Sequence, residues 1–131
     1  MDAKAAARRW ADILRTAWPA GDVDSFLALY ADDAGYRTPL EKPERAIDHM
    51  RRSLALGEPG PDVWVGEPLV SGDRAAVEWW AVIVIDGEEH SFVATSWLRF
   101  DDDGLVVDEH DYWRTAPGRI DPWDGWGVAS S

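Results

Sequence analysis

The sequence predicts an α+β domain with three N-terminal helices packed on one strongly curved, mainly antiparallel sheet. Apolar residues recur at helical spacing in the N-terminal part of the chain, whereas the chain after Pro61 shows the alternation and short turns of antiparallel strands. The 131 residues fit a single domain, because ordinary domains hold about 100–150 residues. We therefore expect one domain over residues 1–131.

Three helices are expected before Pro61. The first extends from Ala3 to Trp18 and is stopped by the sequence Pro19-Ala20-Gly21. Asp22 is a suitable N-cap for a second, short helix with residues 26–30 on its apolar side. A short strand over 34–38 follows, and Pro43 is expected in the first turn of a third helix that ends at the loop 57–61.

The rest of the chain is expected to form an antiparallel meander. Its strands cover residues 63–70, 74–85, 88–100 and 105–113. The Asp86-Gly87 pair is typical of a type I′ hairpin turn, which joins the second and third of these strands. The tail over 114–131 keeps Trp123 and Trp126, which predicts that it packs on the fold.

Composition and charge exclude several functions. The formal net charge of −12, from 25 acidic and 13 basic residues, argues against binding to nucleic acid or to an anionic membrane surface. No apolar stretch reaches the roughly 20 residues of a membrane span, and no signal-peptide core is present, so a cytoplasmic protein is expected. The chain has no cysteine, and His49, His90 and His110 lack the spacing of metal ligands. Neither a metal nor a cofactor is therefore expected. His49 is expected to be half exposed on its helix, and the alternative is that it points inward as an acid–base partner.

The two turns predict the register of the long strands. The two-residue turn pairs Trp79 with Ala94, and the four-residue turn over 101–104 pairs Ala94 with Asp111. Side chains alternate along a strand, so one face of the sheet carries Trp79, Ala94, Asp111 and other mostly apolar residues, and should meet the helices.

That apolar face also contains two carboxyl groups, those of Glu109 and Asp111. They lie across from the small residues Ala94 and Ser96, which leaves space beside them. Nine Trp residues exceed what a small core needs and indicate a lined pocket, a subunit interface, or both. We therefore predict a pocket with an acidic floor and with Trp79 and Trp113 as walls. The alternative is that both acids reach the sheet edge or pair with Arg in solvent.

The opposite face of the sheet mixes aromatic with charged residues. It carries Trp80, Trp97 and Tyr112 beside Arg99 and His110, and no helix remains to cover it. Uncovered aromatic residues on a sheet are typical of a subunit interface, which predicts a homodimer through the face with Trp80 and Trp97. The alternative is a solvated face.

Several segments resemble one known superfamily. They are the first helix ending in Trp18, the run from Phe26 to Tyr36, the long hairpin, the closing strand over 107–113 and the tail ending in 125–127. Together they resemble the nuclear-transport-factor-2-like superfamily, most closely its SnoaL-like branch of cone-shaped α+β proteins. The resemblance covers nearly the whole chain, and it is specific for the fold and poorly specific for any reaction.

The resemblance implies several candidate activities, of which two lack key residues here. In limonene-epoxide-hydrolase-like enzymes the long strand carries an Arg–Asp pair, whose positions hold Trp79 and Ala81 in this chain. Ketosteroid isomerases use a Tyr on the first helix, and this helix has none. The chain resembles SnoaL-like polyketide cyclases best, since one Asp deep in their cone acts as both acid and base. Asp111 matches that role by position.

The sequence therefore predicts cofactor-free acid–base catalysis on a small apolar carbonyl compound, such as an isomerisation, cyclisation or dehydration. Asp111 is expected to shuttle the proton and Tyr36 to donate a hydrogen bond to the developing oxyanion. The alternative is a ligand-binding or protein-interaction module that does no chemistry on the same fold. The residues expected to bind the substrate are Trp79, Trp113, Glu109, Thr38, Phe92 and Ala94.

Overall fold

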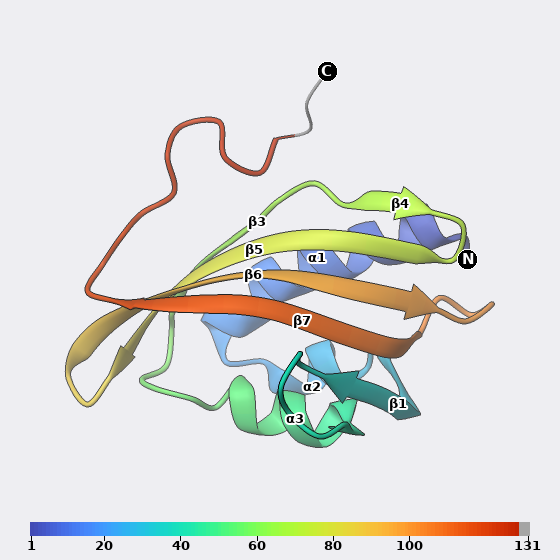
Figure 1. Ribbon diagram of the computed structural model, residues 1–131, viewed down its shortest axis with the longest axis horizontal. Helices are drawn as coiled ribbons and strands as arrows, with labels where there is room; N and C mark the ends of the chain where they lie inside the picture. Colours follow the sequence, from blue (N-terminus) through green and yellow to red (C-terminus); the bar gives the residue numbers. More distant parts are fainter. Residues whose placement is uncertain (129–131) are drawn as a thin grey trace.

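The computed structural model describes residues 1–128 (Figure 1). The helices are α1 (Ala3–Ala20), α2 (Val23–Leu27) and α3 (Ala46–Ser53). The strands are β1 (Tyr30–Arg37), β2 (Glu44–Arg45), β3 (Asp62–Val65), β4 (Leu69–Ser71), β5 (Arg74–Ile85), β6 (Glu88–Phe100) and β7 (Val106–Pro117).

The strands form one mainly antiparallel curved sheet in the order β2-β1-β7-β6-β5-β3, with β4 also paired to β5. The exception is β1, which runs parallel to β7. Helix α1 crosses one face of the sheet behind β5 and β6, and α2 and α3 lie near β1 (Figure 1). The predicted α+β class with three helices on a curved sheet is confirmed. No helix in residues 1–128 is long and apolar enough to cross a membrane.

Local sequence explains how the two N-terminal helices begin and end. The side chain of Asp2 accepts a hydrogen bond from the Ala5 amide at 2.8 Å and caps α1. Gly21 has a φ of 71° and ends α1 in the left-handed conformation, which only glycine adopts without strain. Asp22 caps α2 as predicted, since its carboxylate accepts from the Ser25 amide at 3.2 Å.

Several strand and helix boundaries differ from the sequence-based expectation. Pro43 does not begin α3, because Glu44–Arg45 pair with β1 as the short strand β2, and the helix starts only at Ala46. The expected strand 63–70 is divided into β3 and β4. Pro68 has no N–H to continue the ladder, and at Gly66 the chain passes so close to the tail that a Cβ there would lie 3.2 Å from Gly127 Cα.

Strand β1 also begins earlier than expected, at Tyr30 rather than residue 34. Strand β7 runs from Val106 to Pro117 and is longer than the expected strand 105–113. The extra residues of β7 belong to the segment predicted as tail, and they pair with β6 as far as His90.

The register of the first hairpin is confirmed, and that of the second is wrong by two residues. Trp79 pairs with Ala94 as predicted, but Ala94 pairs with Trp113 instead of Asp111. One residue of the shift arises because Leu105 belongs to the turn, where its amide donates to the Asp101 carboxylate at 2.9 Å. The other comes from a β-bulge opposite Arg99 and Phe100. Beyond the bulge the shift is two residues, which leaves Glu109, Asp111 and Trp113 on their predicted face, whereas before it Val106 is buried in place of Val107.

The C-terminal segment covers part of the face that lacks helices. Trp80 on β5 is only 7% exposed, and its indole N–H donates to the Ile120 carbonyl at 2.9 Å. The rings of Trp123 and Trp126 contact the Trp80 ring edge-on, with centroids 5.9 and 5.7 Å away. The segment therefore packs on the sheet. Residues 129–131 of the expected tail lie outside the described part of the chain.

Candidate functional site

A cavity of about 200 Å³ lies between the helices and the sheet face that carries the two buried acids. An apolar cavity of about 150 Å³ is large enough for benzene, so this one fits a molecule of about one substituted ring. Its apolar lining is Trp10, Leu14, Trp18, Phe26, Met50, Leu54, Leu56, Trp79, Ile83, Phe92 and Trp113. Its polar lining is Tyr36, Thr38, Glu41, His49, Ser53, Ser96, Glu109 and Asp111.

The polar centre of the cavity is a pair of buried carboxyl groups on β7. Glu109 and Asp111 lie two residues apart and therefore point to the same face of the strand, where they are 1% and 5% exposed. The Tyr30 hydroxyl donates to Glu109 Oε1 at 2.5 Å, and the Trp10 indole N–H donates to the same hydroxyl at 3.0 Å. Tyr30 lies on β1, Trp10 on α1 and both acids on β7, so the fold assembles the pair and its donors from three elements.

The second carboxyl group of the pair is held by Tyr36. The Tyr36 hydroxyl donates to Asp111 Oδ2 at 2.8 Å. This contact exists because β1 runs beside β7, with Tyr36 aligned to Glu109. Burial and the neighbouring Asp111 carboxylate raise the pKa of Tyr36 far above its ordinary value, so that its hydroxyl stays protonated.

The environment of Glu109 disfavours its charged form. Burial raises the pKa of Glu109 well above its usual range, and the charge and hydrogen bond of Asp111 raise it further. Both effects favour the protonated form of the Glu109 carboxyl group. Asp111 Oδ1 is buried and has no hydrogen-bond partner within residues 1–128, so this oxygen is available to a molecule in the cavity.

His49 on α3 forms part of the cavity wall. Its ring stacks on the Tyr36 ring with centroids 3.6 Å apart and planes inclined by 16°. Burial lowers the pKa of His49 below its ordinary value, although Glu44 opposes this effect, so the imidazole is neutral at pH 7. The residue thus lines the cavity next to the catalytic candidates, whereas the sequence placed it at a half-exposed position of the helix.

The structure brings most of the sequence-predicted site residues together. Seven of the eight predicted residues line the cavity, namely Asp111, Tyr36, Glu109, Thr38, Trp79, Phe92 and Trp113. Ala94 is buried on the same sheet face but does not contribute to the lining. The Trp79 indole N–H donates to Ser96 Oγ at 3.0 Å, which fixes the Trp79 ring as a wall. Trp113 is 49% exposed and therefore lies toward the mouth.

Sequence reasoning missed three polar or aromatic residues of this site, Tyr30, Trp10 and Ser53, and gave the inward orientation of His49 only as its alternative. Tyr30 was assigned to a helix, and Trp10 was treated as an apolar helix residue, yet both take part in the hydrogen bonds to Glu109. His49 and Ser53 lie one turn apart on α3, a spacing that places them on one helix face. That spacing was the only sequence signal for this side of the site. Within residues 1–128, no group of three or more His, Asp or Glu side chains has the arrangement of a metal site.

Comparisons with known proteins agree with the fold. The profile of the SnoaL-like domain matches residues 7–109, a segment that includes Glu109 and ends before Asp111. A crystal structure from Kribbella flavida DSM 17836, provisionally described as a ketosteroid isomerase, is 26% identical. It superposes with a TM-score of 0.65 over 94% of this chain and 83% of that one. An epoxide hydrolase of M. tuberculosis, described as LEH-like, is 20% identical with the same TM-score over 83% and 82% of the two chains. No curated protein matches the sequence significantly.

Proposed function

Because this chain belongs to the SnoaL-like domain family, we propose that its cavity binds a small apolar carbonyl compound and catalyses proton transfer on it without a cofactor. The observation that supports this proposal most strongly is the Asp111 side chain, which is buried in a mostly apolar cavity beside Glu109, whose pKa is raised by burial. A carboxylate that is largely withdrawn from water is a stronger base toward a weakly acidic C–H bond than a solvated one.

The proposed reaction is an enolisation followed by return of the proton. The Asp111 carboxylate takes the proton from the carbon next to the substrate carbonyl, and the C–H electron pair becomes the C=C bond of an enolate. The carbonyl π pair moves onto the oxygen. Asp111 then returns the proton to another carbon of the conjugated enolate, so the net reaction is an isomerisation and no proton is lost.

Tyr36 supplies the hydrogen bond to the enolate oxygen in this proposal. Its hydroxyl donates to Asp111 Oδ2 in the free protein. When Asp111 takes up the substrate proton it becomes neutral and a weaker acceptor, whereas the substrate oxygen becomes charged and a stronger one. The Tyr36 hydroxyl therefore makes a stronger hydrogen bond to the substrate oxygen than to Asp111 as the negative charge moves to that oxygen. This hydrogen bond stabilises the transition state more than the bound substrate.

The cavity walls support a cyclic apolar substrate. Trp79 and Trp113 present aromatic surfaces, and the ring of Trp113 lies 6.4 Å from that of Phe92. The likeness to a crystal structure described as a ketosteroid isomerase favours a ketone. The cavity volume of about 200 Å³ favours a one-ring ketone over a fused four-ring system.

The test uses 3-cyclohexen-1-one, whose conversion to the conjugated 2-cyclohexen-1-one is followed by ultraviolet absorbance. We expect Asp111→Asn to lower kcat by at least about 100-fold, the usual contribution of a general base. Tyr36→Phe should lower it about 100-fold, as for loss of one oxyanion donor. The matched control is Asp108→Asn, on the same strand but on the opposite face, which should leave kcat unchanged.

A different result would favour the non-catalytic alternative. If the ketone binds with unchanged affinity to wild type and Asp111→Asn while neither shows turnover or α-proton exchange in D₂O, the catalytic proposal is wrong. The chain is then a binding module on the same fold. The cytoplasmic location stays a prediction from the sequence.

A further inference from the structure

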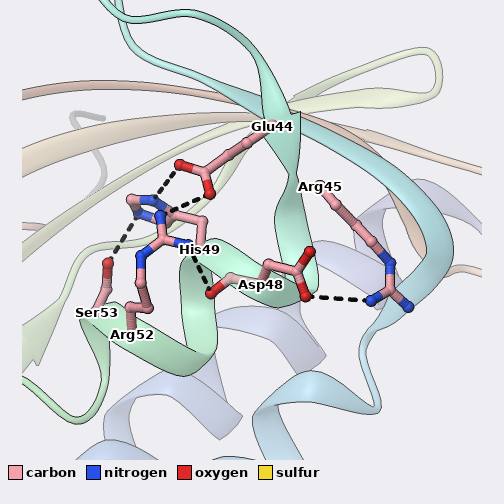
Figure 2. Close-up of polar contacts among 6 residues, drawn as sticks. All are labelled: Glu44, Arg45, Asp48, His49, Arg52 and Ser53. Carbon is pink, nitrogen blue, oxygen red and sulfur yellow. Dashed lines mark hydrogen bonds and ion pairs between the residues drawn. The ribbon is translucent and has the colours of Figure 1, made fainter.

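A second group of polar side chains, Ser53, His49 and Glu44, lies on the α3 side of the cavity, and Ser53 and His49 line it (Figure 2). Ser53 Oγ lies 2.9 Å from His49 Nε2, and His49 Nδ1 lies 3.4 Å from Glu44 Oε2. Figure 2 shows the imidazole between the hydroxyl and the carboxylate. A nucleophile, a base in hydrogen-bond reach and an acid that orients the base are the parts of a nucleophilic catalytic site, whatever the fold.

The Ser53 hydroxyl is not used by the helix backbone. A hydroxyl on a helix usually donates to a carbonyl one turn earlier, and Thr16 on α1 does so toward the Asp12 carbonyl at 2.9 Å. Ser53 instead has its contact with the His49 ring. The hydroxyl proton therefore already points to a base.

The contacts of His49 fix which ring nitrogen accepts that proton. A carboxylate only accepts hydrogen bonds, so Glu44 places the ring proton on Nδ1 and leaves Nε2 as the acceptor toward Ser53. Arg52 donates to the other Glu44 oxygen at 2.6 Å and holds the carboxylate in place. Glu44 also stabilises the imidazolium that would form when His49 takes a proton.

The hydroxyl and the imidazole face the same cavity as the carboxyl pair but use none of its residues. Ser53 and His49 both line the cavity, and Met50, Leu54 and Leu56 surround them with apolar surface. An acyl group of a few carbons fits against this wall. We propose that Ser53 is an activated nucleophile and that the chain hydrolyses aryl esters of small apolar acids, with His49 as base and Glu44 as positioning residue.

The two steps of the reaction balance without a cofactor. Ser53 Oγ attacks the ester carbonyl carbon and its proton passes to His49 Nε2. The bond to the aryl oxygen breaks, and the phenolate leaves with the electron pair and takes up the proton that His49 releases. Water then attacks the acyl-serine, His49 takes the water proton, and that proton returns to Ser53 Oγ as the acid departs. Aryl esters are the fitting class because a phenolate leaves without prior protonation.

The experiment uses 4-nitrophenyl acetate as the probe and measures both phenolate release and the mass of the peptide that contains Ser53. We expect turnover and, after rapid quenching, an acetyl group on Ser53. Ser53→Ala should abolish both, and His49→Gln should lower turnover by at least about 100-fold. Thr16→Ala, which removes a helix hydroxyl bonded to backbone, is the control and should leave turnover unchanged.

Glu44→Gln tests the positioning role by its pH profile. The carboxylate charge raises the pKa of His49, while Arg52 lowers it and Asp111, facing from β7, raises it. Loss of the Glu44 charge should move the rise of kcat/KM to lower pH, an effect that a purely structural role would not produce. Thermal unfolding of the variant checks that it is folded.

The inference is overturned if wild type shows no turnover and no acetylated Ser53, or if Ser53→Ala turns over at the wild-type rate. Turnover by Ser53→Ala at the wild-type rate would show that His49 alone causes any hydrolysis. The proposal does not rest on the ketone reaction, because its nucleophile and base, Ser53 and His49, have no assigned part in the proton transfer on the ketone.

Discussion

Glu109 is the residue whose protonation state most affects both stability and chemistry. Its pKa is raised in the folded chain, so the folded state binds a proton that the unfolded state releases above about pH 4.3. The free energy of unfolding therefore falls as pH rises from that value toward the raised pKa, by up to about 1.4 kcal/mol per pH unit from this group.

Glu109→Gln keeps a neutral side chain of the same shape and removes this titration. We expect the variant to lose less stability than wild type between pH 5 and pH 8, with the largest difference at the higher pH. Urea unfolding at several pH values measures the difference. Glu88→Gln, at the exposed start of β6, is the matched control and should follow the wild-type pH profile. Equal slopes of the free energy of unfolding against pH for Glu109→Gln and wild type would show that Glu109 is not the protonated group.

At the scale of elements, the turn chemistry predicted the first hairpin and failed for the second. Asp86-Gly87 specifies a two-residue turn, and both residues adopt the positive φ that this turn requires. The second turn depends on where Asp101 directs its carboxylate and on a bulge in β7, neither of which has a clear sequence signal. Asp111 still lies on its predicted face, because the two errors add up to two residues and side chains on a strand alternate with a period of two.

The same reasoning explains which site residues the sequence could identify. Alternation along β5, β6 and β7 predicts that Trp79, Glu109 and Asp111 share one face, since short turns join these three strands. Tyr30 reaches Glu109 only because β1 pairs in parallel with β7, a contact between residues 79 positions apart. Parallel pairing of distant segments is set by the tertiary fold and has no local signal.

The C-terminal segment acts as a cover for the outer face of β5. Trp126 contacts Trp80 edge-on, and the Glu67 amide donates to the Gly127 carbonyl at 2.8 Å. We expect Trp126→Ala to lower the free energy of unfolding by about 1–2 kcal/mol, because the half-buried ring packs against Trp80. Urea unfolding measures this. Leu69→Ala, at an exposed position of β4, should change it little, and equal effects of both variants would contradict the covering role.

At the scale of the whole molecule, the net charge of −12 opposes association of two copies, so a contact between them needs exposed apolar surface. On the uncovered part of the outer sheet face Trp97 and Tyr112 are 52% and 50% exposed. Arg74, Arg99 and Asp108 line the same hollow. Trp80, the other residue expected at a dimer interface, is covered by the chain's own tail.

A dimer of this protein should therefore form around Trp97 and not around Trp80. Sedimentation equilibrium of wild type is expected to give twice the chain mass of 14.6 kDa. Trp97→Glu places a charge in the apolar centre of that interface and adds to the repulsion between two acidic chains, so it should weaken association at least about tenfold. Leu40→Glu adds the same charge at a position that is 98% exposed and should leave the mass unchanged. A dimer that persists in Trp97→Glu would show that the contact lies elsewhere. A monomeric wild type would show that the face with Trp97 and Tyr112 is exposed to solvent.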